Sequence, residues 1–497
     1  MFKLTEDSPE KYGIPREAVK RLEQLFDEQR IHIHGYMLLG GRSVLAEKYY
    51  EPFGRDELHR IYSITKTYVA LAVGLLIKNG LVKPDDHICD YFPEKLPPQG
   101  AHPWCAEMTI KDMLQMRTCY ASTTYKAYEG CDWTKSFFVA EPDHICGTVF
   151  NYDTSAAHVL GALVEKLTGM DLIDYLRKEA FDELGFSSDA YAMKDPVGVS
   201  QGGSGFMCTL RDMASVAYLV NHYGELDGKE IIPESYIRQA ISNLTPTDMQ
   251  PVIDEQNGYG YFIWMPRTRT GEDAWGSENG FVMYGLGGQL AVCFPKYDFC
   301  YLTIADTIGN SAGLQILYDS FYYTIYPYLR ERRSDNPRAF APEEKKLPDG
   351  IYWEGQRGEK NIIYSPSSEA STYTDGETQY IFYKNNNGWR KVSFDFKASV
   401  VNLEYTDADG TDKQLRLTYG VEAPRRCRPF SDNECRCAVQ GMFKQGHLII
   451  SCYMEDEELG HVNMDFAWKD DSRLSVRMAA SNEPYYKHLK GFGSAHK

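Results

Sequence analysis

The chain has 497 residues, of which 43% are hydrophobic and 25% charged, a composition typical of globular proteins that bury a large core. Its formal net charge of −17 makes nucleic acid and anionic membrane surfaces unfavourable partners. No apolar stretch reaches the length of about 18 residues that a transmembrane helix needs. The N-terminal residues contain no basic segment followed by an apolar one, so we expect a cytoplasmic protein with reduced thiols.

Residues 1–335 combine helical and strand patterns. A hairpin is predicted over 35–50, with its turn at "GGR" (40–42), and two further strands over 287–307. Between them, apolar residues recur at three- and four-residue spacing, which predicts helices after Ser63 and over 109–118, 154–169 and 209–224. Strands at both ends with helices between them predict an α+β domain, in which one antiparallel sheet is assembled from the two ends around a helical insert.

The charged, proline-containing residues 336–347 are predicted to form a linker, and residues 348–497 a separate domain. The C-terminal pattern alternates with a period of two and is interrupted by turn residues such as "NNNG" and "DADG". We therefore expect an all-β barrel or sandwich there. The last residues, "KGFGSAHK", are predicted to be disordered.

Twelve cysteines are spread through the chain, with one local cluster at Cys427, Cys435 and Cys437 and with Cys452 downstream. Three or four thiolates could bind zinc. Because paired C-x-x-C motifs are absent, we interpret them as thiols and expect no metal.

The segment "HRIYSITKTYVALAVGLLIKNG" (59–80) contains Ser63 and Lys66, three residues apart at the start of an apolar helix. At a helix start the Ser63 N–H has no helical partner, and the helix dipole would stabilise an oxyanion there. Burial would lower the pKa of Lys66, making it a suitable base for a serine nucleophile. The alternative is an N-cap serine beside a lysine that extends to solvent. Since the same S-x-x-K spacing also occurs at residues 8–11 and 494–497, the spacing alone does not choose between the two.

Two further segments contain candidate residues. Tyr152 precedes a helix that Thr154 or Ser155 could cap, and a tyrosine beside a neutral lysine can pass a proton; the alternative role is ordinary packing. The strand "FVMYGLGGQLAVCFP" (281–295) contains glycines that leave backbone N–H groups approachable by a ligand, unless they mark a β-bulge.

The order and separation of these three elements resemble the serine β-lactamase and penicillin-binding-protein superfamily. The similarity lies with its class C-like branch, which includes esterases and 6-aminohexanoate-dimer hydrolases. It covers roughly residues 10–330. "HRIYSITKTYVALAVGLLIKNGLVKPDDHICDYFPE", "MTIKDMLQMRTCY" and "GGSGFMCTLRDMASVAYLV" are all similar to segments of that family.

The resemblance implies specific roles for several residues. Ser63 would be the acylated nucleophile, Lys66 its base, and Tyr152 the tyrosine of the family's Y-x-N motif. The backbone N–H groups of Ser63 and Leu286 would form the oxyanion hole. The residues that would contact substrate are Thr154, Gly285, Gly287 and Gly288.

Two positions depart from the family pattern. Thr154 replaces the Y-x-N asparagine, and Met283 replaces the lysine of the K-T-G motif, which receives a substrate carboxylate in lactamases. "GLGGQ" is closer to the esterase and oligomer-amidase members.

We therefore expect a serine hydrolase that cleaves an ester or amide bond of a small substrate through an acyl-enzyme, without a cofactor, and that could form oligomers. The alternatives are a β-lactamase or D-alanyl-D-alanine carboxypeptidase, and a non-catalytic binding or scaffold module on the same fold.

Overall fold

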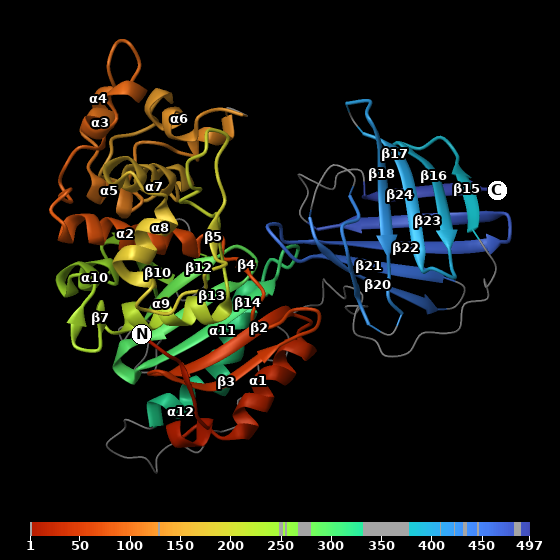
Figure 1. Ribbon diagram of the computed structural model, residues 1–497, viewed down its shortest axis with the longest axis horizontal. Helices are drawn as coiled ribbons and strands as arrows, with labels where there is room; N and C mark the ends of the chain where they lie inside the picture. The colour runs from red at the N-terminus through yellow and green to blue at the C-terminus, as the bar shows by residue number, and fades with distance from the viewer. Residues whose placement is uncertain are drawn as a thin grey trace.

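The structure is a computed structural model of the 497-residue chain. The residues that it describes are 2–127, 130–247, 252–253, 256–266, 280–331, 377–407, 409–421, 423–430, 435–444, 447–481 and 489–497. These residues form two units, each with its own hydrophobic core, and the units lie side by side (Figure 1). The predicted linker 336–347 and the predicted domain start at residue 348 lie outside the described residues.

The first unit is built on a nine-stranded sheet with the order β1-β3-β2-β14-β13-β12-β11-β10-β9. Its strands are β1 (Thr5–Glu6), β2 (His32–Gly40), β3 (Ser43–Tyr49), β9 (Thr245–Pro246), β10 (Gln256–Tyr259), β11 (Trp264–Pro266), β12 (Phe281–Gly285), β13 (Gln289–Phe294) and β14 (Phe299–Asp306). Strand β14 pairs antiparallel with β2, in a register that places Phe299 opposite Gly40. The sheet therefore joins the early hairpin to the late strands, and the predicted α+β class is confirmed.

Two small sheets complete the strands of this unit. One has the order β4-β6-β5 and the other is the hairpin β7-β8. Their bounds are β4 (His59–Arg60), β5 (Tyr191–Ala192), β6 (Phe206–Cys208), β7 (Glu225–Leu226) and β8 (Lys229–Glu230). Strand β4 leads directly into the segment that contains Ser63.

Most helices of this unit come from the insert between β3 and β9. The helices are α1 (Arg16–Glu28), α2 (Ile64–Lys78), α3 (Ile88–Tyr91), α4 (Pro103–Ala106), α5 (Ile110–Leu114), α6 (Trp133–Val139), α7 (Thr154–Thr168), α8 (Leu172–Leu176), α9 (Leu210–Asn221), α10 (Glu234–Ala240), α11 (Gly313–Thr324) and α12 (Tyr326–Glu331). Helix α2 is buried along almost its whole surface and packs against α7 and β12, which fixes its position in the molecule. Helix α9 packs on the large sheet against β2, β13 and β14.

The second unit is a ten-stranded antiparallel sheet with the order β18-β17-β16-β15-β24-β23-β22-β21-β20-β19. Its strands are β15 (Glu377–Phe382), β16 (Trp389–Asp395), β17 (Val400–Thr406), β18 (Asp412–Thr418), β19 (Arg425–Cys427), β20 (Cys437–Lys444), β21 (His447–Met454), β22 (His461–Asp470), β23 (Arg473–Ala480) and β24 (Gly491–His496). A bridge between Leu415 and Phe430 joins the region of β18 to that of β19. The sheet is thus a nearly closed barrel, as predicted.

The predicted disorder of the last residues is wrong. Residues Gly491–His496 form β24, which pairs with β23 on one side and β15 on the other. The segment "GFGSAH" has weak strand propensity by itself, but two neighbouring strand edges need partners for their backbone N–H and C=O groups. Tertiary pairing, and not local sequence, makes this segment a strand.

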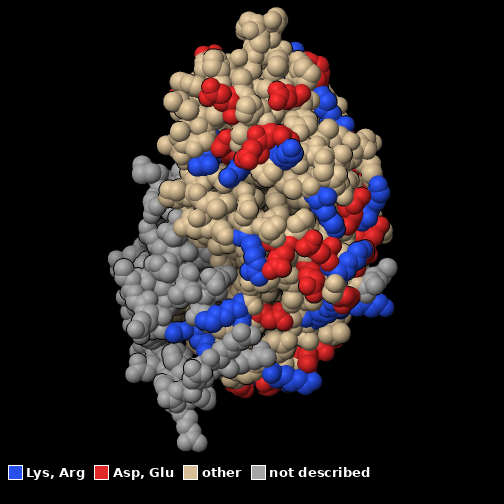
Figure 2. Space-filling view, turned by 90° about the vertical axis from the view of Figure 1, so that its left-hand side faces the viewer, with Lys and Arg blue, Asp and Glu red and all other residues tan. Residues whose placement is uncertain are grey.

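The surface has charges of both signs. In the view of Figure 2, acidic side chains lie beside lysines and arginines instead of forming one continuous acidic field. Among the helices that the structure describes, none combines the length and apolarity needed to span a bilayer. The net charge of −17 is therefore distributed over a surface on which many acids have basic neighbours.

Candidate active site

Ser63 lies at a strained turn between β4 and α2. The residue before it, Tyr62, has φ +45°, a left-handed conformation that is rare for an aromatic residue and is often found at functional sites. Ser63 occupies the N-cap position of α2, but its side chain makes no capping hydrogen bond. The alternative of a helix-capping serine is therefore not realised.

The side chain of Lys66 is fully buried and does not reach solvent. Its Nζ lies 2.9 Å from Oγ of Ser63 and 2.6 Å from the carbonyl oxygen of Gly203. Burial lowers the pKa of Lys66 to about 7, because an ammonium group loses its hydration there. The amine can thus be neutral near physiological pH while in contact with the Ser63 hydroxyl.

Tyr152 lies against the same pair. Nζ of Lys66 is 4.8 Å from the centre of its ring, and a hydrogen bond to Ser63 opposes the rise in its pKa that burial causes. The ring is held by stacking on Trp264, with 5.4 Å between the ring centres and 13° between the planes. The structure thus brings together the hydroxyl, amine and phenol that the sequence placed in three separate segments.

Asp153 is a site residue that the sequence interpretation missed. Its carboxylate caps α7 by accepting a hydrogen bond from the N–H of Ser155, so the predicted cap by Thr154 or Ser155 is wrong. It also accepts a hydrogen bond of 3.1 Å from Thr118, and burial raises its pKa to about 6. Its negative charge acts on Lys66 by raising the lysine pKa. An aspartate directly before a helical pattern is a usual N-cap, and this signal was available in the sequence.

Gly203 is a second missed residue. Its carbonyl oxygen accepts the hydrogen bond from Lys66, and it is packed against α7. A Cβ at this position would lie only 2.3 Å from Cγ2 of Thr154, so a larger residue could not occupy it without displacing the helix. Thr154, predicted to contact substrate, therefore directs its methyl group toward Gly203. The "GGSG" run before β6 was the available signal.

The turn between β12 and β13 closely approaches the segment directly before Ser63. A Cβ on Gly285 would lie 2.2 Å from the carbonyl oxygen of Ile61, so only glycine allows this contact. Gly287 and Gly288 have φ +82° and +91°, which glycine adopts without strain. This contact brings Leu286, whose N–H is the predicted oxyanion donor, close to the turn that contains Ser63.

The buried side chain of Gln289 braces this turn. Its Nε2 donates hydrogen bonds of 3.0 Å to the carbonyl oxygen of Leu286 and 2.7 Å to that of Ala305. The first bond fixes the peptide plane that follows Leu286. The sequence interpretation had assigned no role to Gln289.

The comparison with known families agrees with this arrangement. The family profile described as Beta-lactamase matches residues 19–300, which is more than half of the chain. The chain belongs to the beta-lactamase family. The matched region runs from α1 into β14 and includes Ser63, Lys66, Tyr152 and the β12–β13 turn.

Similar proteins point to the same superfamily. The 6-aminohexanoate-dimer hydrolase of Paenarthrobacter ureafaciens is 24% identical over 311 residues, covering 57% of this chain and 77% of that protein. The solved structure of simvastatin synthase from Aspergillus terreus has a TM-score of 0.51 at 14% identity, covering 64% of this chain and 99% of the other. EstCE1, a hydrolase with promiscuous acyltransferase activity, has a TM-score of 0.50 at 15% identity, covering 62% and 99%. At such identities these structures show the fold alone.

One departure from the beta-lactamase pattern is visible in the core. Met283, which the sequence resemblance aligns with the K-T-G lysine, is only 1% exposed. A buried methionine cannot form an ion pair with a substrate carboxylate. The position that the resemblance aligns with that lysine therefore carries no cation.

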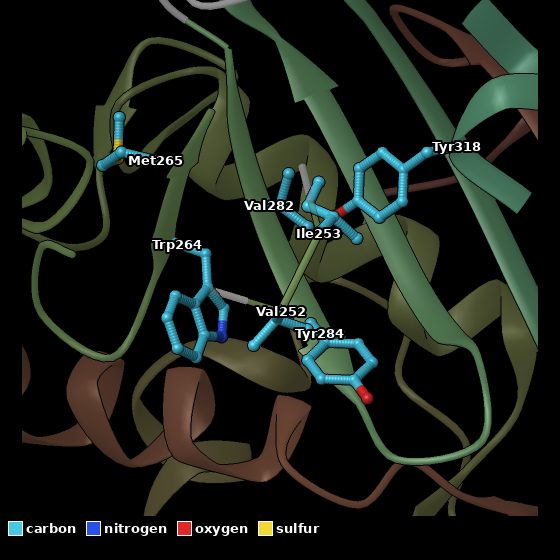
Figure 3. A pocket seen from close by; sticks show the side chains of 7 residues that line it. All are labelled: Val252, Ile253, Trp264, Met265, Val282, Tyr284 and Tyr318. Atoms are coloured by element: carbon cyan, nitrogen blue, oxygen red, sulfur yellow. The ribbon is translucent and has the colours of Figure 1, made fainter. Parts of the chain in front are cut away.

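An apolar cavity lies beside Tyr152. It encloses about 10 Å³, room for about one water molecule, and its lining includes residues of strands β11 and β12 (Figure 3). Trp264, which stacks on Tyr152, forms part of its wall, and the hydroxyl of Tyr284 points away from Tyr318. The lining residues are Val252, Ile253, Trp264, Met265, Val282, Tyr284 and Tyr318.

No group of three or more His, Cys, Asp or Glu side chains is placed to hold a metal ion in the part of the chain that the structure describes.

Proposed function

We propose that this chain is a serine hydrolase that cleaves an ester or amide bond of a small substrate through an acyl-enzyme on Ser63. The observation that carries this proposal is the 2.9 Å contact between Nζ of a fully buried Lys66 and Oγ of Ser63. A general base must be within hydrogen-bond reach of the proton that it takes and must have a pKa near the working pH. Lys66 meets both requirements, with a pKa of about 7.

In the acylation step, Oγ of Ser63 attacks the carbonyl carbon while Lys66 accepts its proton. The hydrogen bond between Lys66 and the carbonyl oxygen of Gly203 holds the amine in place during this transfer. Tyr152, next to both groups, passes the proton on to the leaving alcohol or amine. Water then attacks the acyl-enzyme, and the same groups return the proton to Ser63.

The negative charge that develops on the substrate oxygen needs donors fixed in advance. We assign this role to the backbone N–H groups of Ser63 and Leu286. The close approach of Gly285 to Ile61 and the bracing of the turn by Gln289 support this assignment. Gly287 and Gly288, with Thr154, would line the substrate path.

The proposed substrate is uncharged near the scissile bond. The buried Met283 supports this, because it provides no cation for a substrate carboxylate. The similarity to a 6-aminohexanoate-dimer hydrolase supports an amide among the possible substrates. We also propose domain limits of 1–335 for the hydrolase domain, 336–347 for the linker and 348–497 for the β domain.

The test replaces the nucleophile. We expect Ser63→Ala to reduce hydrolysis of p-nitrophenyl acetate by at least about a thousandfold, because attack by the hydroxyl is lost. It should also abolish labelling by a fluorophosphonate probe, with the adduct of the parent located on Ser63 by mass spectrometry. Ser215→Ala changes a different buried serine and should retain both the ester hydrolysis and the fluorophosphonate labelling. Hydrolysis by Ser63→Ala at the parental rate would exclude the proposed role.

Turnover of nitrocefin separates this proposal from a β-lactamase. Since Met283 replaces the carboxylate-binding lysine, we expect kcat/KM for nitrocefin to be far below that for the ester. Comparable values would favour the β-lactamase alternative, and a parent protein without any adduct on Ser63 would favour a binding module.

A further inference from the structure

Leu459 occupies an unusual position between the two units. It is only 6% exposed, yet it belongs to neither hydrophobic core. It lies in the loop Glu455–Gly460 between β21 and β22, which is closed at its base by a hydrogen bond from the N–H of Met454 to the carbonyl oxygen of Gly460. The burial of Leu459 therefore comes from contacts across the junction of the two units.

This loop is bonded to the turn that presents Ser63. The N–H of Leu459 donates a 3.0 Å hydrogen bond to the hydroxyl of Tyr62, the residue directly before the nucleophile. Arg60 donates a hydrogen bond of 3.0 Å to the carbonyl oxygen of Glu457 and forms a 3.3 Å ion pair with Glu458. Arg60 and Tyr62, on either side of Ile61, thus both bind the loop.

Arg60 also connects the loop to the backbone beside Gly203. Its Nε donates a 2.9 Å hydrogen bond to the carbonyl oxygen of Ser204, the residue after the Lys66 acceptor. A fourth contact comes from β5, where the hydroxyl of Tyr191 donates to Glu457 at 2.8 Å. The loop is therefore bonded to two separate segments of the first unit, Arg60–Tyr62 and β5, and through Arg60 it is linked to Ser204.

The side chain of Leu459 lies against the glycine turn. A Cβ on Gly287 would be only 2.3 Å from Cδ1 of Leu459, so the leucine covers the backbone directly after Leu286. Figure 1 shows this loop of the second unit extending toward β4 and β14 of the first. Leu459 thus adjoins the turn that contains the proposed oxyanion donor.

We propose that the loop Glu455–Gly460 forms one wall of the catalytic cleft and that Leu459 limits the length of the acyl group. This inference rests on the proposed function. When the N–H of Leu286 binds the carbonyl oxygen of an acyl group, the acyl chain extends from the carbonyl carbon past the next residues of the turn. The isobutyl group of Leu459 stands there, so the second unit sets a specificity limit for chemistry performed by the first.

The experiment measures an acyl-chain profile with p-nitrophenyl acetate and p-nitrophenyl hexanoate. Leu459→Ala removes three carbons from the wall, and each accommodated methylene improves kcat/KM by about tenfold. We expect the hexanoate-to-acetate ratio of kcat/KM to rise by at least about tenfold in this variant. A ratio of two substrates is insensitive to the fraction of active enzyme.

A matched control and a second variant complete the test. Leu448→Ala makes the same change in the core of the second unit and should leave the ratio unchanged while lowering the melting temperature. Tyr62→Phe removes the acceptor for the Leu459 N–H and loosens the hold on Leu459 while the Arg60 and Tyr191 contacts remain, so it should raise the ratio in the same direction by a smaller factor. This variant keeps the proposal testable if Leu459→Ala does not fold.

The outcomes distinguish this inference from the proposed function. An active parent whose ratio is unchanged in both variants, or rises equally in Leu448→Ala, overturns the role of Leu459 and leaves the serine hydrolase intact. A parent that neither cleaves the esters nor forms an adduct on Ser63 overturns both proposals.

Discussion

At the scale of single residues, the state of Lys66 is set by two opposing effects. Burial removes hydration and favours the neutral amine, whereas the carboxylate of Asp153 favours the ammonium form. Asp153 is itself buried and held by Ser155 and Thr118, so its charge remains close to the amine. The balance gives a base with a pKa of about 7, not the value of an ordinary lysine.

The first prediction concerns this balance. If neutral Lys66 is the base, kcat/KM for ester hydrolysis should rise with pH through about 7. Asp153→Asn removes the charge that raises the lysine pKa, so the rise should shift to lower pH by roughly half a unit or more. Asparagine is also a good N-cap, which preserves α7.

The pH profile of Asp212→Asn provides the control. Asp212 is a buried aspartate in the first turn of α9, and its replacement should leave the midpoint of the rise unchanged. A midpoint that is also unchanged in Asp153→Asn would mean that Lys66 does not control the profile.

At the scale of elements, the β12–β13 turn depends on one buried amide. Gln289 is fully buried and donates to the carbonyl oxygens of Leu286 and Ala305, while its Oε1 accepts a 3.3 Å bond from the N–H of Ala305. The turn is thereby tied to β14, the strand next to β13. The proposed oxyanion donor, the N–H of Leu286, lies in the preceding peptide of the same turn, so Gln289 supports it through the turn.

We therefore predict that Gln289→Leu reduces kcat by about a hundredfold with little change in KM, because the turn that carries the proposed oxyanion donor loses its support. The carbonyls of Leu286 and Ala305 would both lose this donor, and that of Ala305 is buried, so the free energy of unfolding should also fall by about 1–3 kcal/mol. Steady-state kinetics and urea unfolding measure the two effects. The control is Gln440→Leu, a change of a buried glutamine in the barrel, which should not alter kcat. An unchanged kcat in Gln289→Leu would exclude the role of Gln289 in supporting the turn.

At the scale of the whole molecule, the two units meet around buried histidines. His32 lies with its ring 4.3 Å from that of Tyr453 in the second unit, and His34 stacks on Phe53 at 3.8 Å. Burial lowers the pKa of His32 and of His59 to about 4, and it also lowers the pKa of His34. The junction is therefore assembled around neutral imidazoles.

These shifts predict acid sensitivity of the junction. The unfolded chain binds protons at its histidines below about pH 6.5, whereas the folded protein does not until about pH 4, so stability falls as the pH decreases between these values. Each of His32 and His59 should lower the free energy of unfolding by about 3 kcal/mol between pH 7 and pH 4. Asp306 and Glu57 favour the charged rings, while His461 and Arg436 oppose them.

Urea unfolding at pH 7, 5.5 and 4 measures this effect. His59→Gln should reduce the loss of stability between pH 7 and 4, and the same change at the exposed His87 should not. Equal losses in His59→Gln and the parent would show that the junction histidines do not cause the acid sensitivity.

Much of the fold could be predicted from the chain. The hairpin over 35–50, the apolar helix after Ser63 and the alternating strands of the barrel are local patterns, because their hydrophobic periodicity reflects burial directly. The strand at Gly491–His496 could not be predicted, since its partners β15 and β23 supply the pairing. Gly203 was missed because its role depends on a carbonyl brought to Lys66 from 137 residues away.

The sequence by itself determined that a hydroxyl and an amine lie three residues apart at the start of one apolar helix, where their side chains can be neighbours. Only the tertiary structure decided the pKa of that amine and which residues surround the pair. Desolvation of Lys66, its distance from Asp153, and the contact of Leu459 with Gly287 all depend on segments that are far apart in the chain. The pKa of a group and the shape of a cleft arise from packing in three dimensions, which no local pattern encodes.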